Sequence, residues 1–255
     1  MATEATQRPV PTRRERQRQA TLDEIVEVSR SLLTDPAGLS LRAVANRMGI
    51  TAPALYRYVA SYQELVYLLA ADIDAETARM LAIARDTQPA DDPVARITCS
   101  AIAFRRWALS HKEEFSLVFA NPLTAHDAER ADDIKDVQTG QVFTDLLLQI
   151  WGTFQFPIPA VADLDPAVVE ALRDPLIPAK VEEIPEEALG LVWVFMQSWA
   201  ALYGTVTLEV FGHCDPRVIS SGALFRSMLA SQGDLLGISG ELDRLQPTID
   251  AELAR

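Results

Sequence analysis

The sequence has few of the residues that build metal sites, disulfide frameworks and catalytic centres. Its 255 residues include two cysteines, Cys99 and Cys214, and three histidines, His111, His126 and His213. They form no CxxC, HExxH or HxH pattern, so we expect reduced thiols, no metal site and no cofactor. P-loop, GxSxG and GxGxxG motifs are also missing, which argues against an enzyme.

Long hydrophobic runs are scarce as well. No segment reaches about 18 residues without a charged or strongly polar interruption, and the first residues contain no apolar stretch, so neither a membrane helix nor a secretion signal is predicted. We therefore expect a soluble, cytoplasmic protein. Apolar residues make up 49% of the chain and recur at helical spacing, which predicts an all-α fold.

The chain has an excess of negative charge, but not everywhere. Its formal net charge is −13, yet residues 1–70 carry nine arginines against seven acidic residues. Residues 71–255 hold all the excess of acid. This division predicts that a small amino-terminal region meets a polyanion while the remainder repels it.

Residues 40–53 contain the start and stop signals of two short helices. Ser40 is placed to cap a helix over 41–48, and Gly49 can adopt the positive φ of a tight turn. Thr51 is placed to cap the next helix, with Pro53 in its first turn, where a missing N–H costs nothing. A helix-turn-helix requires this arrangement, although two core helices of an ordinary α domain would read similarly.

Longer helices are predicted on both sides of this pair. A helix over about 12–33 begins with crowded arginines, against the preference of a helix N-terminus for acids, which hints at an external anion. Ser61 with Glu64 three residues later forms a capping-box pattern that opens a fourth helix, running to about Ile83. Small side chains at the start of the second short helix would let its backbone approach DNA, while arginines and tyrosines supply donors. The predicted DNA-contacting residues are Arg13, Arg14, Arg16, Arg18, Ser40, Arg42, Thr51, Ala52, Pro53, Ala54, Tyr56, Arg57, Tyr58 and Tyr62.

Residues 20–70 resemble the DNA-binding domain of the tetracycline-repressor (TetR) family, most specifically in "GLSLRAVANRMGITAPALYRYVASYQEL". The resemblance implies a dimeric, ligand-responsive transcription factor, in most members a repressor. Carried over by position, it implies DNA contacts from Arg42, Thr51, Ala52, Pro53, Tyr56 and Tyr58. Tyr62 stands where the family usually has a phosphate-binding lysine.

The resemblance and the helical pattern predict four parts. A disordered basic arm (1–14) precedes a three-helix DNA-binding domain (15–70), which a fourth helix joins to a larger ligand-binding and dimerisation domain (71–237), followed by a weakly ordered tail (238–255). Helices in the larger domain are predicted at 93–119, 126–155, 167–173, 186–212 and 216–232.

The helix over 186–212 is apolar on two faces. One face can pack inside its own domain and the other on a second subunit, although a monomer could bury both. Its sequence also resembles a TetR subgroup with a Trp…His-Gly signature; Trp199 and Gly204 fit, but Tyr203 replaces the histidine. The predicted dimer-interface residues are Leu189, Trp193, Ala200, Gly204, Thr207, Val210, Phe225 and Met228.

Aromatic residues gather in two stretches of the larger domain, 104–119 and 143–154. Such clusters can be plain core, or they can line a pocket for a small apolar or aromatic effector. The predicted effector-binding residues are Phe104, Arg105, Trp107, Phe119, Phe143, Leu147, Gln149, Trp151, Met196, Gln197 and Tyr203.

Three functions remain open. The first is a homodimeric repressor that binds palindromic double-stranded operator DNA, and that an effector releases by filling the larger domain and swinging the fourth helix. The second is the same scaffold acting as an activator or without a ligand. The third is a helical bundle that binds small molecules and no DNA.

Overall fold

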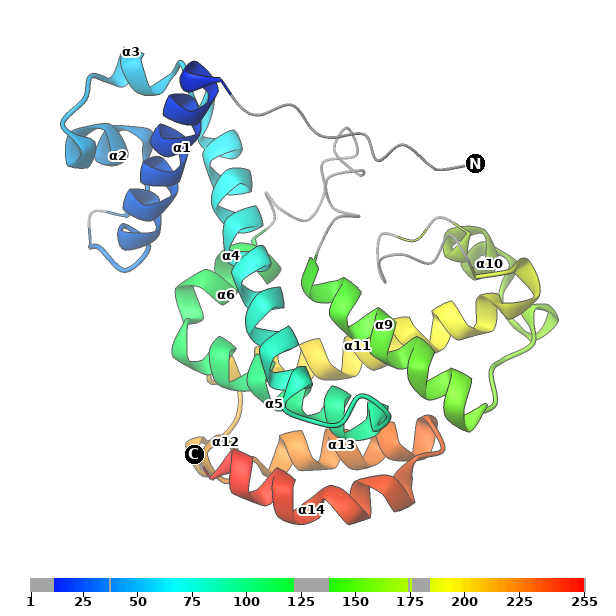
Figure 1. The fold of residues 1–255 in the computed structure, drawn as a ribbon. Helices are drawn as coiled ribbons and strands as arrows, with labels where there is room; N and C mark the ends of the chain where they lie inside the picture. The colour runs from blue at the N-terminus through cyan, green and yellow to red at the C-terminus, as the bar shows by residue number, and fades with distance from the viewer. Residues whose placement is uncertain (1–11, 37, 122–137, 174, 176–183, 255) are drawn as a thin grey trace. The chain divides into compact units, whose positions relative to one another are not determined.

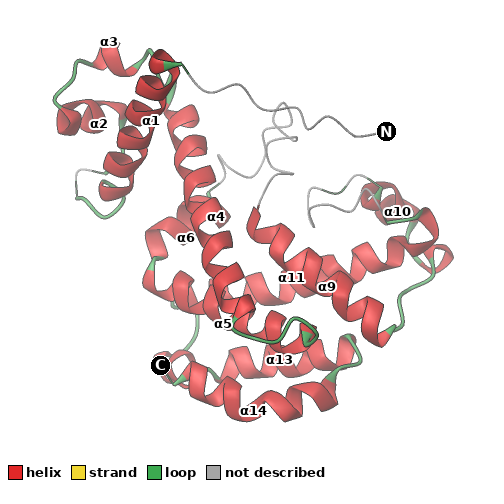
Figure 2. Cartoon of the chain, in the orientation of Figure 1, coloured by secondary structure: helices red, strands yellow, loops and turns green. Residues whose placement is uncertain are grey.

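A computed structural model describes residues 12–36, 38–121, 138–173, 175 and 184–254. These residues form helices and connecting loops, and no strand occurs among them (Figure 2). The predicted all-α fold is confirmed. The chain divides into two compact units, Met1–Asp72 and Ile73–Arg255.

The first unit contains α1 (Arg13–Ser31), α2 (Leu41–Met48), α3 (Ala52–Leu55) and the beginning of α4 (Tyr62–Asp86) (Figure 1). Apolar side chains from all four helices and the connecting turns form one small core. Its fully buried members are Ile25, Leu32, Val44, Ala45, Leu55, Val59 and Leu65.

Helix α1 begins earlier than the predicted boundary of the basic arm. Thr12 and Glu15 form a capping box, in which the Thr12 hydroxyl accepts from the Glu15 N–H and the Glu15 carboxylate accepts from the Thr12 N–H. Arg13 and Arg14 therefore belong to α1 rather than to a disordered arm, because this cap satisfies the first turn locally. Residues 1–11 of the predicted arm lie outside the described residues.

The turn between α2 and α3 has the predicted backbone. The Ser40 hydroxyl accepts from the Ala43 N–H at 3.2 Å, and Gly49 ends α2 with a φ of 68°. Thr51 differs from expectation, because it stands at the start of α3 without a side-chain cap. Helix α3 is a single turn, and residues 56–58 continue it as turns.

In the described part of the second unit lie the rest of α4 and ten further elements. They are α5 (Pro93–Ser110), α6 (Lys112–Phe119), α9 (Gln138–Phe154), η2 (Val161–Asp163), α10 (Pro166–Leu172), η3 (Glu186–Ala188), α11 (Leu189–Val210), α12 (Pro216–Ser221), α13 (Ala223–Leu235) and α14 (Ser239–Leu253).

Two helices that the sequence predicted as continuous are interrupted in this unit. The helix expected over 93–119 is two helices, because His111 leaves the helical region with φ −129° and ψ 56°. The helix expected over 216–232 is interrupted by Gly222, whose φ is 65°. Of the helix expected over 126–155, residues 138–154 are helical and its first part lies outside the described residues.

The carboxyl-terminal segment is helical rather than weakly ordered. In α14, Leu245 and Ile249 are buried in the core of the second unit, although Pro247 lies between them. Arg226 of α13 also reaches Asp250, at 2.9 Å. Tertiary burial thus outweighs the weak helical pattern on which the prediction of a frayed tail depended.

Helix α11 runs through the core of the second unit and packs on α5, α10 and α13 (Figure 1). Together with η3 it is the one described helical stretch, Glu186–Val210, long and apolar enough by length and composition to cross a membrane. The sequence pattern predicted no such stretch. Val192, Phe195 and Val206 are nevertheless fully covered by the protein itself, which is what a core helix requires.

Candidate nucleic-acid interface

The α2–α3 pair presents an exposed, polar face from the first unit. Arg42 lies exposed in the first turn of α2, and Thr51, Ala52 and Pro53 lie exposed at the start of α3. Tyr56, which ends α3, is 51% exposed although it is large and aromatic. Small side chains beside an exposed arginine and tyrosine can approach a nucleic-acid backbone closely and donate hydrogen bonds to it.

The same segment also holds the core together. Leu55 and Val59 are fully buried, and Tyr58 is half-buried against the same core cluster. Ala54 is half-buried and Ser40 is occupied as a helix cap. Tyr58, Ala54 and Ser40 therefore position the face more than they extend from it.

Arginines of α1 lie next to the segment that follows α3. Arg18 donates from Nη1 to the carbonyl oxygen of Arg57 at 3.3 Å, and its Cζ lies 5.5 Å from the centre of the Tyr58 ring. Sequence reasoning missed this contact, because the partners are 39 positions apart and only the folded helices bring them together. Arg16 is exposed on the same helix.

The start of α4 carries the departure from the family pattern. Tyr62 is its first residue and is 42% exposed. The Ser61 hydroxyl accepts from the Glu64 N–H at 3.0 Å, while the Glu64 carboxylate accepts from Ala60 rather than from Ser61. The predicted cap is thus confirmed at Ser61 and displaced by one residue at Glu64.

In the second unit, aromatic residues from both predicted stretches form one cluster. The Phe104 ring of α5 lies centrally, 5.4 Å from Phe119, 6.1 Å from Phe143 and 5.9 Å from Trp199. Trp107 also contacts Phe104. Rings from α5, α6, α9 and α11 therefore meet at a single place.

Tyr203 joins this cluster and makes a polar contact at its edge. Its ring stacks on Trp199 at 6.0 Å, and its hydroxyl donates to the carbonyl oxygen of Phe119 at 2.9 Å. Phe119 is the last residue of α6. Tyr203 thus satisfies one of the carbonyls that a helix end leaves unpaired.

Four residues predicted for the effector site make no ring contact in this aromatic cluster: Arg105, Gln149, Met196 and Gln197. Arg105 instead forms a buried ion pair with Glu209 at 2.6 Å and donates to the Ile219 carbonyl at 2.7 Å, so its charge is already matched. Gln149 and Gln197 lie exposed, and Met196 packs beside Leu172 in a separate small cluster.

Leu147 is buried and Trp151 is half-buried, both in the main core.

Most of the residues predicted for the dimer interface are covered by the chain itself. Leu189, Val210, Phe225 and Met228 are buried inside their own chain, and Trp193 packs on the small cluster around Leu172. Helical periodicity does not reveal which apolar face meets the protein's own core. Ala200 is exposed, and Gly204 and Thr207 are half-buried.

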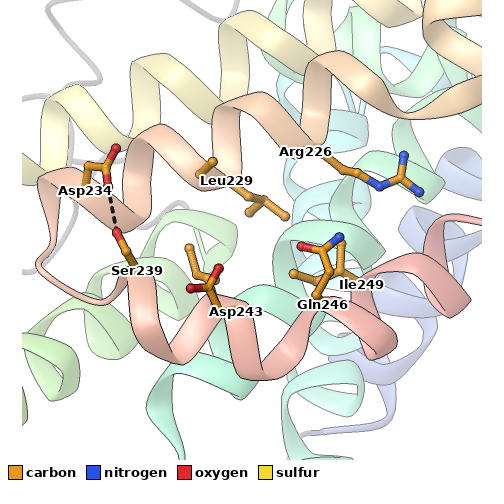
Figure 3. A pocket seen from close by; sticks show the side chains of 9 residues that line it. Arg226, Leu229, Asp234, Ser239, Asp243, Gln246 and Ile249 are labelled. Atoms are coloured by element: carbon orange, nitrogen blue, oxygen red, sulfur yellow. Dashed lines mark hydrogen bonds between the residues drawn. The ribbon is translucent and has the colours of Figure 1, made fainter.

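A shallow hollow lies between α13 and α14, and interactions within the protein account for polar side chains at its rim (Figure 3). Asp234 accepts a hydrogen bond from Ser239 at 2.7 Å, and Arg226 pairs with Asp250. Asp234, Ser239 and Arg226 thus already have partners within the protein. Among the described residues, no three histidine, cysteine, aspartate or glutamate side chains are grouped to hold a metal ion.

Comparison with known proteins identifies the family. The family model described as "Tetracyclin repressor-like, C-terminal domain" matches residues 97–232. Two HTH-type transcriptional regulators, one from Mycobacterium bovis and one from Mycobacterium tuberculosis, are each 31% identical over 198 residues, covering 74% of this chain and 80% of theirs. The chain belongs to the tetracycline-repressor family.

A solved structure agrees with this membership. The crystal structure of a protein named as a regulatory protein, SCO4313, superposes with a TM-score of 0.59 at 29% identity, covering 89% of this chain and all of the other. The chain is accordingly a TetR-family helix-turn-helix transcriptional regulator. Its likeness to the Trp…His-Gly subgroup stays a prediction.

Proposed function

We propose that this regulator binds double-stranded operator DNA through the α2–α3 face and acts as a repressor. The observation that carries the proposal is the exposed set Arg42, Thr51 and Tyr56 on a capped helix-turn-helix in the less acidic unit of the chain. In a helix-turn-helix, the first residues of the second helix contact base edges, and neighbouring side chains and amides contact phosphates.

A homodimer would place two such faces on one palindromic site, with half-sites about one DNA turn (~34 Å) or a multiple of it apart. The exposed residues Ala200 and Leu208, with the half-buried Gly204 between them, lie at helical spacing on α11. No described atom lies within 4 Å of a Cβ placed at Gly204. This face supports dimerisation, because small residues let two helices approach closely.

The effector would be a small apolar or aromatic molecule bound at the aromatic cluster around Phe104. Support comes from the four helices that meet there and from one connection to α4, the helix shared by both units. The Asp74 carboxylate of α4 accepts from the Gln138 N–H at 2.7 Å and from the Thr139 N–H at 3.3 Å, at the start of α9. A shift of α9 on effector binding would therefore act on α4 and lower operator affinity. A regulator with this activity works in the cytoplasm.

The test begins with DNA selection. Purified full-length protein is mixed with fragmented genomic DNA of the source organism, and retained fragments are sequenced. We expect enriched fragments that share a palindromic sequence; the absence of any enriched sequence would overturn the proposal.

Fluorescence anisotropy on the selected duplex then tests the residues. Arg42→Ala is expected to weaken binding about 10-fold, within the range of a lost base contact. The matched control is Arg217→Ala, which removes an arginine with a 91% exposed side chain from the second unit. Equal affinities of the two variants would show that the face is assigned wrongly.

A further inference from the structure

The first two turns of α1 and the segment after α3 enclose a strongly basic hollow in the first unit. It is lined by Arg13, Arg14, Gln17, Arg18, Arg57 and Tyr58. Four of the six lining residues are arginines and none is acidic. Positions 13, 14, 17 and 18 share one face of α1, because residues four apart lie one above the other on a helix.

Carboxylates of the described residues do not neutralise this concentration of positive charge. Among the described residues, no carboxylate pairs with the guanidinium groups of Arg13, Arg14 or Arg57. The nearby Glu15 is turned to the Thr12 N–H, and this hydrogen bond lowers the pKa of Glu15. Arg14 and Arg18, four positions apart on a helix, repel each other. Such an arrangement is stabilised when an anion enters it.

The α1 amides do not explain the hollow. The Thr12 hydroxyl already accepts from the Glu15 N–H at 3.3 Å, so the N-terminus of α1 is capped from within. The attraction for an anion therefore resides in the arginine side chains, which come from two separate elements.

We propose that this hollow is a phosphate-binding clamp that grips the DNA backbone beside the groove read by α3, and that Arg13, Arg14 and Arg57 are its ligands. The inference rests on the proposed DNA binding and extends it to a second set of contacts. Guanidinium groups match phosphate oxygens in charge and geometry, and backbone contacts fix the register of a protein on the duplex. The clamp also supplies phosphate contacts in place of the lysine that the family usually has where this chain has Tyr62.

Arg18 has a different role from its neighbours. Its guanidinium donates to the Arg57 carbonyl at 3.3 Å and lies over the Tyr58 ring. It therefore joins α1 to the segment that carries Arg57. Arg18 is a positioning residue, which holds the two walls of the clamp together.

The decisive experiment measures operator affinity of the full-length protein across salt concentrations. Each lost phosphate contact lowers the slope of log K against log salt by about 0.9, so Arg13→Ala/Arg14→Ala should lower it by about 1.8 per half-site. Between about 50 and about 200 mM salt, the wild type should therefore lose ~12-fold more affinity per half-site than the variant, or ~150-fold more for a dimer bound to both half-sites. An unchanged slope would overturn the clamp.

The control is Arg30→Ala, which removes one arginine from the other end of the same helix, about 24 Å from Arg14 at 1.5 Å per residue. Its slope should match the wild type. The ratio of operator to unrelated-DNA affinity should stay constant in Arg13→Ala/Arg14→Ala and fall in Arg42→Ala, because only base contacts carry sequence information. If the wild type binds no DNA, the proposed function fails; if Arg42→Ala alone changes binding, only the clamp fails.

A double-mutant cycle tests the positioning role of Arg18. Arg18→Ala, Arg57→Ala and the double variant should lose similar affinity, because removal of Arg18 already frees Arg57 from its place. Unchanged melting temperatures of the three variants would exclude a general loss of folding. Additive losses would contradict positioning, since independent contacts add.

A last comparison separates the DNA backbone from a small anion as the source of phosphate. Melting temperatures are measured with sodium phosphate or sodium chloride at equal ionic strength. We expect about 1 mM phosphate to leave the wild type and the Arg13→Ala/Arg14→Ala variant equally stable. Stabilisation of the wild type alone would identify a small-anion site and overturn the proposal.

Discussion

At the scale of single residues, Tyr62 separates what a family pattern implies from what this chain can do. The family usually places a lysine at this position, and here an exposed tyrosine offers one hydroxyl at the start of α4. A hydroxyl can donate a hydrogen bond to phosphate but releases no counterion as a cation does. DNA affinity here should therefore depend more on the arginines of α1.

Tyr62→Lys is expected to tighten operator binding and to steepen its salt dependence by about 0.9 per half-site, because one phosphate is newly neutralised. Anisotropy titrations between about 50 and about 200 mM salt, a range that includes physiological ionic strength, would measure both the affinity and its salt dependence. Tyr62→Gln is the neutral control. A lysine variant indistinguishable from the wild type would show that position 62 does not meet phosphate.

Gly190 shows how a single residue can limit packing in the second unit. A Cβ at this position would lie 2.0 Å from the Pro159 carbonyl oxygen, which belongs to the backbone and cannot rotate away. Gly190→Ala should therefore lower the free energy of unfolding by about 2 kcal/mol through overpacking.

Urea denaturation measures this loss. Gly152→Ala is the matched control, because a Cβ at this helical position meets no described atom within 4 Å. It should be neutral or stabilising by up to about 1 kcal/mol. Equal stabilities of the two variants would contradict the close approach of Gly190 to Pro159.

At the scale of elements, the local signals were those that the sequence predicted best. Ser40, Gly49 and Ser61 act within three or four residues, and each lies where the pattern placed it. The division at His111 and the helix α14 were missed, and in α14 the burial of Leu245 and Ile249 in the core of the second unit outweighs the weak local pattern.

The candidate sites follow the same rule. The exposure of Arg42 and Tyr56 was predictable from the helix-turn-helix pattern. The contact of Arg18 with Arg57 and the ion pair of Arg105 with Glu209 join residues 39 and 104 positions apart. No local pattern in one sequence specifies such pairs.

The junction of α4 with α9 should make stability depend on pH. Burial raises the pKa of Asp74, although hydrogen bonds from Thr139 and Gln138 oppose the shift. The folded protein therefore binds this proton more tightly than the unfolded chain. The contribution of Asp74 is fully present below the unfolded pKa of about 3.9 and is lost as pH rises through the folded pKa.

Asp74→Asn removes this titration. The unfolding free energy of the wild type minus that of the variant should rise as pH falls from about 7 to about 4. Urea denaturation at several pH values measures the difference, in which groups common to both proteins cancel. Asp72→Asn, which removes an exposed carboxylate from the same helix, serves as control. A pH-independent difference would contradict the burial of Asp74 as the cause.

At the scale of the whole molecule, the proposed binding to a palindromic operator requires two copies of the chain. The predicted interface residues Leu189, Val210, Phe225 and Met228 are occupied by the chain's own core. The remaining surface of α11 around Gly204 is what a second copy can use. The proposed dimer would then use the face of Ala200, Gly204 and Leu208 rather than the apolar stripes of the sequence.

Ala200→Glu/Leu208→Glu is expected to convert a dimer into a monomer, because burying two new carboxylates against their symmetry copies is costly. Light scattering at micromolar concentration should show the mass fall by half. The control is Ile83→Glu, at a position that is 72% exposed and lies outside this face. A mass unaffected by the double substitution would place the interface elsewhere.

The central proposal is that the first unit binds operator DNA through the α2–α3 face. Hydrogen–deuterium exchange of the full-length protein, with and without the selected operator duplex, tests it most directly. We predict that operator DNA slows exchange in residues 13–18 and 40–62, and that an unrelated duplex slows it less at the same salt concentration. Protection confined to residues 73–255, or none with any selected DNA, would contradict the claim.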